Sequence, residues 1–207
     1  MDGGAIYRPC AFTRVRTTGG PRYLLAMCGD TEESVQNGVP AMDSEGTPGA
    51  IDLYILKPIS GRTELETILS QENIQSGHNG TSGEVSIQRL GPHLFGFAIE
   101  DNDSTEGYSQ TMRRIYLPLG EKLALAAPRI NVSLDNSDSN ACYDDKQTCE
   151  KRDFSIAPDT TSAADVYPLL VTESGRRGGK PLQANFKLAF DVSKGAYVIP
   201  EEVSAGY

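Results

Sequence analysis

Four cysteines carry the clearest chemistry in this sequence. Cys10 and Cys28 flank residues 17–21 (TTGGP), which are typical of a turn, and Cys142 and Cys149 enclose a short acidic loop. With the turn centred on its glycines, residues whose numbers sum to about 38 lie opposite each other, so Cys10 faces Cys28 across a hairpin. Opposed β-carbons lie about 4.5–5.5 Å apart, which is close to disulfide distance. The spacing therefore predicts two disulfides, Cys10–Cys28 and Cys142–Cys149.

Zinc is the other chemistry open to the second pair. Zinc knuckles place about two to four residues between their cysteines, whereas six residues separate Cys142 from Cys149 and no histidine lies near them. Disulfides persist in oxidising compartments. We therefore expect a periplasmic or secreted protein whose signal peptide or lipid anchor was removed, because residues 1–4 (MDGG) form neither a basic nor an apolar leader region. The alternative is a cytosolic protein.

Residues 101–107 (DNDSTEG) place several oxygen atoms within one tight turn. Hard cations bind such oxygens, so Asp101, Asp103 and Glu106 are candidate calcium ligands. The segment departs from the EF-hand pattern, because its fifth and sixth positions lack the expected residues and Met112 stands where a Glu belongs. The other interpretation is a solvated hairpin tip. We expect no cofactor, with calcium at this loop as the alternative.

Residues suited to catalysis are sparse. The two histidines, His78 and His93, lie in a Gly-rich loop and at the start of an expected strand, and no Gly-x-Ser-x-Gly motif occurs. Glu100 and Asp101 are adjacent, so a strand directs them to opposite faces and not to one glycosidic bond. The chain also contains no Trp that could stack against a sugar. These observations predict a protein that is not an enzyme.

The formal net charge of −9 is concentrated in clusters. No Lys or Arg stands between Tyr23 and Leu56, and further acidic runs occur over residues 100–106 and 135–145. Such a surface repels nucleic acid and anionic membranes and attracts a basic protein, although acidity also serves solubility alone. The predicted partner contacts are Asp101, Asp103, Glu106, Tyr108, Tyr143, Asp144 and Asp145.

Strand patterns dominate the elements that must position these residues. Residues 182–192 alternate between apolar and polar side chains, and a turn at 193–195 (SKG) leads to a return strand at 196–199. Further strands are expected at 5–16, 23–28, 51–56, 84–90, 94–100, 110–119, 122–134 and 167–172.

One helix is expected, over residues 62–73. Ser60 is its candidate N-cap, and Leu65, Ile68 and Leu69 form one apolar stripe at helical spacing. The fold class is therefore mainly β, an antiparallel sandwich or barrel-like fold with this short helix and two disulfides.

A single domain over 1–207 is predicted, with a subdivision near 75–83 as the alternative. No apolar run is long enough to cross a bilayer.

Several segments resemble a group of uncharacterised, signal-peptide-bearing bacterial proteins. The resemblance rests on residues 90–97 (LGPHLFGF), 107–109 (GYS) and 190–200 (FDVSKGAYVIP), together with the Cys142 and Cys149 pair. These motifs consist mainly of glycines and aromatic residues. The resemblance implies export from a bacterial cytoplasm and brings no catalytic residues with it.

Charge, export and sparse catalytic chemistry together predict a periplasmic binding protein. The most concrete version is an inhibitor or immunity protein that neutralises a basic, cell-wall-targeting effector, such as a type VI secretion toxin, by blocking its surface. Two alternatives remain open. One is an exported hydrolase that uses carboxylates or a metal, and the other is a calcium-dependent envelope adhesion module.

Overall fold

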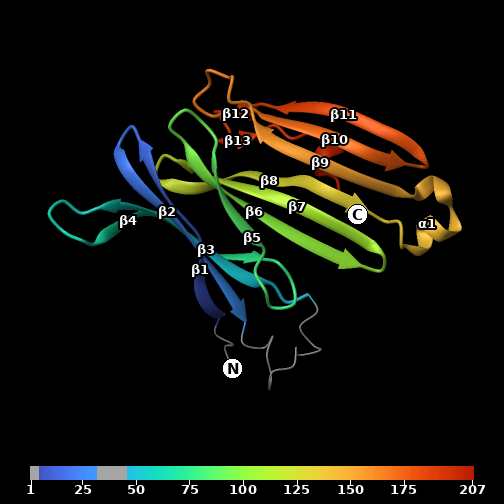
Figure 1. Cartoon of the computed structure of the whole chain (residues 1–207), viewed down its shortest axis with the longest axis horizontal. Helices are drawn as coiled ribbons and strands as arrows, with labels where there is room; N and C mark the ends of the chain where they lie inside the picture. The colour runs from blue at the N-terminus through green and yellow to red at the C-terminus, as the bar shows by residue number, and fades with distance from the viewer. Residues whose placement is uncertain (1–4, 32–45) are drawn as a thin grey trace. The chain divides into compact units, whose positions relative to one another are not determined.

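The computed structural model describes residues 5–31 and 46–207 of the chain (Figure 1). Residues 1–4, on which the leader interpretation depends, and the acidic residues between 32 and 45 lie outside the described residues. The predicted class is confirmed, because the fold is mainly β and its strands pair antiparallel.

The elements follow in chain order. The strands are β1 (Ala5–Thr17), β2 (Gly20–Thr31), β3 (Gly49–Pro58), β4 (Leu65–Ser76), β5 (Glu84–Arg89), β6 (Phe95–Thr105), β7 (Tyr108–Leu119), β8 (Lys122–Asp135), β9 (Glu150–Pro158), β10 (Leu169–Arg177), β11 (Lys180–Leu188), β12 (Phe190–Asp191) and β13 (Ala196–Tyr197). The helices are α1 (Asn140–Asp144), a 3-10 turn at Lys146–Thr148 and α2 (Glu201–Ser204).

These strands form three sheets and the chain forms two compact units. The sheet orders are β1-β2-β3-β4, β11-β10-β9-β8-β7-β6-β5 and β12-β13. Unit 1 contains Met1–Arg89, His93–Asp101 and Tyr116–Ala124. Unit 2 contains Leu90–Pro92, Asn102–Ile115 and Leu125–Tyr207. Strands β6, β7 and β8 therefore contribute residues to both units.

The core of unit 1 follows from strict alternation along its strands. In β3, Ile51, Leu53 and Ile55 are buried while the residues between them are half-buried. Phe97 and Ile99 of β6 belong to the same apolar cluster. Complete burial of one such side chain stabilises the folded state by about 1.5–3 kcal/mol, so this sandwich-like layer is held mainly by apolar packing.

The helix expected over residues 62–73 is wrong, because residues 65–73 are part of strand β4. Register shifts in the β3–β4 ladder lie between Ile51 and Leu53 and between Ile55 and Leu56. Each shift inserts extra β4 residues, so core-facing positions of β4 no longer fall at every second residue. Leu69 and Ile74, which reach the core, are five residues apart. Leu65 and Ile68 of the expected stripe are exposed instead, so pairing with β3 outweighs the local preference.

The β1–β2 hairpin confirms the disulfide between Cys10 and Cys28. Thr17 pairs with Gly20, so the numbers of paired residues near the turn sum to 37, one less than predicted. A bulge between Pro9 and Ala11 leaves Cys10 as the extra residue of β1. The side chain of a bulged residue need not follow the alternation of its strand, so the sulfur of Cys10 can reach that of Cys28.

Unit 2 contains the turn of the predicted C-terminal hairpin, but the strand before this turn is divided in two. β10 pairs with β11 on one side and, on the other, with β9, which was not predicted from the sequence. The alternation over residues 182–192 does not form one strand. β11 ends at Leu188, and the carbonyl of Ala189 accepts a hydrogen bond from the N–H of Val198 at 2.8 Å. The turn at 193–195 is confirmed by the β12–β13 pair.

All four cysteines are paired, since Cys142–Cys149 is also a disulfide. The pairs indicate an oxidising, extracytoplasmic environment. Of the helices in the described part of the chain, none is long and apolar enough to cross a membrane.

Removing the first disulfide should weaken the fold measurably. We expect the double substitution Cys10→Ser and Cys28→Ser to lower the free energy of unfolding by about 3 kcal/mol, because the cross-link restricts the unfolded chain. Urea unfolding checks this value. The disulfide Cys142–Cys149 closes a shorter loop. Replacing both of its cysteines by serine should therefore lower the free energy of unfolding by about 2.5 kcal/mol. An unchanged urea midpoint in the first variant would contradict the prediction.

Candidate functional site

Two acidic loops that are distant in sequence lie against each other in unit 2. Glu106 and Gly107 form the β6–β7 turn, with φ angles of 52° and 82°. A β-carbon added to Gly107 would lie 2.2 Å from the carbonyl oxygen of Asp138, so the turn packs directly on the segment that leads into α1. Figure 1 places this hairpin tip and α1 at the same end of the sheet. We call this region the acidic end, and it comprises Asp103, Glu106, Tyr108, Asp138, Tyr143, Asp144 and Asp145.

The disulfide loop presents its predicted contact residues on a fixed frame. The Ser139 hydroxyl accepts a hydrogen bond from the N–H of Cys142 and so caps α1. The carboxylate of Asp145 accepts from the N–H of Gln147 and caps the 3-10 turn. The Tyr143 ring is 65% exposed, and the Lys146 ammonium lies 5.1 Å from its centre. The loop therefore exposes an aromatic side chain to solvent while hydrogen bonds hold its own backbone in place.

A cleft of about 440 Å³ opens beside the hairpin tip. Its lining comprises Asp103, Thr105, Glu106, Tyr108, Gln110 and Tyr207. The rings of Tyr108 and Tyr207 meet edge to face with centroids 4.8 Å apart. Burial, followed by the charge of Glu150 and a hydrogen bond to it, raises the pKa of Tyr207. Two aromatic rings flanked by Asp103 and Glu106 suit the side chain of a lysine or arginine.

Asp101 belongs to unit 1. One of its carboxylate oxygens accepts hydrogen bonds from the Ser76 hydroxyl and, at 2.8 Å, from the N–H of Gly77. These bonds hold the end of β4, which gives Asp101 a structural role. Among the described residues, no group of three or more His, Cys, Asp or Glu side chains is arranged to hold a metal ion.

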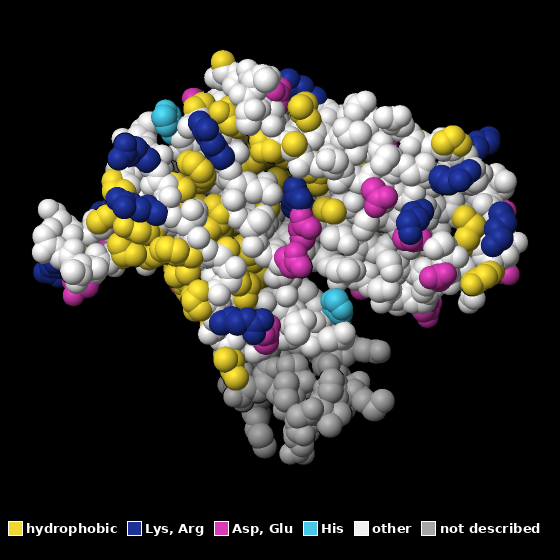
Figure 2. Space-filling view, viewed as in Figure 1, with side chains coloured by type: hydrophobic (Ala, Val, Ile, Leu, Met, Phe, Trp, Pro, Cys, Tyr) yellow, Lys and Arg dark blue, Asp and Glu magenta, His cyan; other side chains and the backbone are white. Residues whose placement is uncertain are grey.

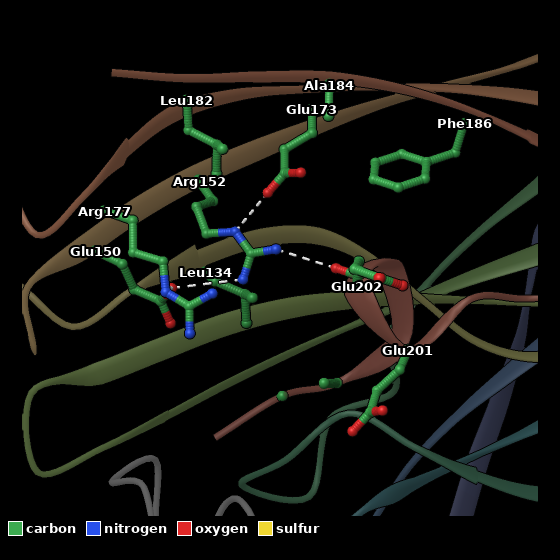
Figure 3. A pocket seen from close by; sticks show the side chains of 12 residues that line it. Leu134, Glu150, Arg152, Glu173, Arg177, Leu182, Ala184, Phe186, Glu201 and Glu202 are labelled. Carbon is green, nitrogen blue, oxygen red and sulfur yellow. Dashed lines mark hydrogen bonds and ion pairs between the residues drawn. The ribbon is translucent and has the colours of Figure 1, made fainter. Parts of the chain in front are cut away.

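A second cleft of unit 2, of about 520 Å³, surrounds an ion-pair network (Figure 3). Arg152 Nε donates to Glu173 Oε1 at 2.6 Å, and another guanidinium nitrogen lies 3.4 Å from Glu150 Oε2. The third nitrogen donates to the backbone carbonyl of Glu202 at 3.0 Å. Arg177 approaches Glu150 from the solvent side at 3.5 Å. The side chains of Arg152 and Glu173 are only 9% and 4% exposed, so each buried charge would destabilise the fold if its partner were removed.

Local strand geometry creates this network. Leu169, Val171 and Glu173 are the buried positions of β10, so the alternation itself directs a carboxylate inward. Arg152 pairs with Gly175, where a β-carbon would lie 2.1 Å from the carbonyl of Lys151. An inward charge within an otherwise apolar alternation is the signal that could have revealed the site in the sequence. The site residues that were not predicted from the sequence are Glu150, Arg152, Glu173 and Tyr207.

The carboxylates of the ion-pair cleft and those of the acidic end differ in their bonding. Both cleft carboxylates that are well buried contact the guanidinium of Arg152, which stabilises their charge and occupies their oxygens. The acidic end, in contrast, keeps Asp103, Glu106 and Asp144 exposed to solvent.

No protein-family model matches this chain, and neither a curated protein nor a solved structure matches it. The class that fold and sites define is therefore a disulfide-linked, antiparallel β protein with an acidic end.

The buried ion pair yields a stability prediction. We expect Arg152→Met to lower the free energy of unfolding by about 3–5 kcal/mol, because it leaves the Glu173 carboxylate buried without a partner. Adding Glu173→Gln should restore much of the loss. Arg177→Met, at a side chain that is 69% exposed, is the matched control and should change stability by about 1 kcal/mol or less. Guanidinium unfolding measures all three, and equal losses in the two single variants would refute the buried-pair explanation.

Proposed function

We propose that this chain is a non-catalytic bacterial binding protein of the periplasm or cell exterior. It neutralises a basic, cell-wall-targeting effector, such as a type VI secretion toxin, by covering part of the effector surface. The observation that carries the proposal is the contact of Gly107 with Asp138. This contact joins the hairpin tip and the disulfide loop into one acidic surface.

The chemistry of the acidic end fits a partner rich in lysine and arginine. Enzymes that approach an anionic cell wall benefit from a basic surface, and opposite charges accelerate their capture. The exposed ring of Tyr143 and the pair Tyr108 and Tyr207 supply flat apolar area beside the carboxylates. Aromatic residues of this kind commonly dominate binding energy at protein interfaces.

Rigidity also supports a binding role. The disulfide Cys142–Cys149, the capped α1 and the close fit of Gly107 all restrict the loops before a partner arrives. Ordering loops on binding costs free energy, so loops that are already ordered lose less of their affinity.

Charge reversal at the hairpin tip tests the proposal. The probes are the cell-wall hydrolases encoded beside the gene for this chain, assayed for binding by calorimetry and for digestion of purified cell wall. We expect the wild type to bind and inhibit one of them. The variant Asp103→Lys with Glu106→Lys should bind at least about tenfold more weakly, because like charges now face the partner.

Glu121→Lys is the matched control, because Glu121 is an exposed carboxylate at the β7–β8 turn of unit 1, outside the acidic end. It makes one such charge reversal where the test variant makes two, and it should leave binding nearly unchanged. If the wild type leaves all of these hydrolases active and unbound, the proposed function is wrong. Equal weakening by both variants would show only a general dependence on net charge.

An exported hydrolase is the second candidate, because the larger cleft brings Glu150 and Glu173 together. Two convergent carboxylates can serve as a general acid and a general base. The candidate predicts turnover of a chromogenic ester, amide or glycoside, and loss of that turnover in Glu150→Gln. Since Glu150→Gln also weakens an ion pair, thermal unfolding of the variant must be measured alongside. A wild type without turnover across such a panel removes this candidate.

A further inference from the structure

The outer face of the β1–β4 sheet is apolar although it is not the face that forms the core. Inward residues of β2 and β3, such as Leu24 and Leu53, are almost fully buried. Side chains alternate along a strand, so the neighbouring positions form the opposite face. We call this the outer face, and it comprises Phe12, Arg14 and Arg16 of β1, Tyr23, Leu25 and Met27 of β2, and Asp52, Tyr54 and Leu56 of β3.

The ladder register arranges these residues in continuous rows. Phe12 lies opposite Leu25, which lies opposite Tyr54. Arg14, Tyr23 and Leu56 form the next row. The Phe12 and Tyr23 rings stack with centroids 6.0 Å apart. The rows therefore form one joined apolar surface and not scattered exposed residues.

This surface remains accessible to water. Phe12 is 60% exposed, and the apolar residues of β2 and β3 on this face are half-buried. Figure 2 shows hydrophobic side chains gathered around the region where Figure 1 places β2 and β4, with basic side chains at their border. Continuous exposed apolar surfaces on soluble proteins commonly mark interaction sites.

Charges of opposite sign stand at the two ends of the outer face. Arg14 and Arg16 lie near the β1–β2 turn, and the Arg14 guanidinium is 5.8 Å from the centre of the Tyr23 ring. Asp52 lies opposite Met27, about 13 Å further along β2 at 3.3 Å per residue. Glu72 of β4 belongs to the same acidic group.

The acidic group is fixed by its contacts with Tyr54. The Tyr54 hydroxyl donates to Asp52 at 3.3 Å, and burial together with the charges of Asp52 and Glu72 raises the pKa of Tyr54 to about 12. Another oxygen of Asp52 accepts from the N–H of Asn73 at 2.7 Å. Both carboxylates are thereby held at one end of the apolar rows.

A surface with a basic end, an apolar centre and an acidic end is complementary to itself after a half-turn. We propose that the outer face binds a second copy of this chain around a two-fold axis. Phe12, Leu25 and Leu56 of each copy pack at the centre, while Arg14 and Arg16 of each copy meet Asp52 and Glu72 of the other. Two-fold interfaces use the same patch twice in this way.

The size of the face sets the expected strength. Four strands at about 4.8 Å spacing span about 19 Å, and the stretch from Pro9 to Arg16 spans about 25 Å, which gives about 500 Å² of face. Stable interfaces bury about 800 Å² of accessible surface per partner. The area of this face is smaller, although side chains that project from the sheet add to it. We therefore expect a reversible dimer with micromolar affinity and not an obligate one.

Sedimentation velocity over a wide concentration range tests the dimer. The wild type should shift from monomer to dimer as its concentration rises. Phe12→Asp should weaken the association at least about tenfold, because it places a charge in the apolar centre. Val192→Asp is the matched control, because Val192 is 84% exposed in unit 2 and lies outside the outer face. It should leave the dimer unchanged.

Mixing two charge variants tests the two-fold arrangement itself. Arg14→Glu with Arg16→Glu places acidic side chains against acidic ones, and Asp52→Asn with Glu72→Lys leaves a net positive charge facing the two arginines. Each variant alone should be monomeric. Their mixture should form a heterodimer, because both charge contacts are then attractive. Far-ultraviolet circular dichroism and thermal unfolding verify that each variant folds.

Three results would overturn the proposal. The first is a wild type that stays monomeric at every concentration. The second is a dimer that Phe12→Asp does not weaken, because it would use another surface. The third is a monomeric wild type that sediments with phosphatidylglycerol vesicles in a Phe12-dependent manner, which would make a lipid surface the occupant. None of these measurements depends on whether a wall hydrolase is bound, so the dimer and the proposed inhibitor function are tested separately.

Discussion

Side chains in paired strands point to alternate faces, and this constraint governs which residues of the chain meet water. A slip of one residue in β3 would expose Ile51, Leu53 and Ile55 and bury Asp52 and Tyr54. Bulges in β1 and β4 keep the correct face inward where the sequence itself does not alternate. The same rule that builds the core of unit 1 therefore also produces its apolar outer face.

In unit 2 the same constraint has an electrostatic consequence. Alternation in β9 and β10 turns Arg152 and Glu173 inward, where an unpaired charge would be strongly unfavourable. The guanidinium of Arg152 has three partners, one of which is a backbone carbonyl of α2. Asn131 adds a second link by donating to the carbonyl of Ala205 at 2.6 Å. The C-terminal residues are thus held by side chains from strands distant in sequence, and they carry Tyr207 to the cleft beside Tyr108.

Local patterns were sufficient for much of the fold. The turn between Cys10 and Cys28 and the short span from Cys142 to Cys149 predicted both disulfides, because few residues separate the partners. Most strands were predicted from alternation, but β4 was not. Its bulges interrupt the alternation, and Leu65, Ile68 and Leu69 happen to have a helix-like spacing in the sequence. β9 was missed because it opens with four charged residues, Glu150 to Asp153, which hide the inward direction of its alternate side chains.

Candidate contacts in the acidic end could be chosen from charge alone, but their proximity could not. Gly107 meets Asp138 only because β6, β7 and β8 are neighbours in one sheet. The Arg152 network likewise joins residues separated by a whole hairpin. The covalent ring from Cys142 to Cys149 has a further consequence for a protein outside the cytoplasm, where proteases are abundant. A peptide bond cut anywhere inside that ring leaves both new ends tethered by sulfur, so the nicked loop stays attached to its sheet.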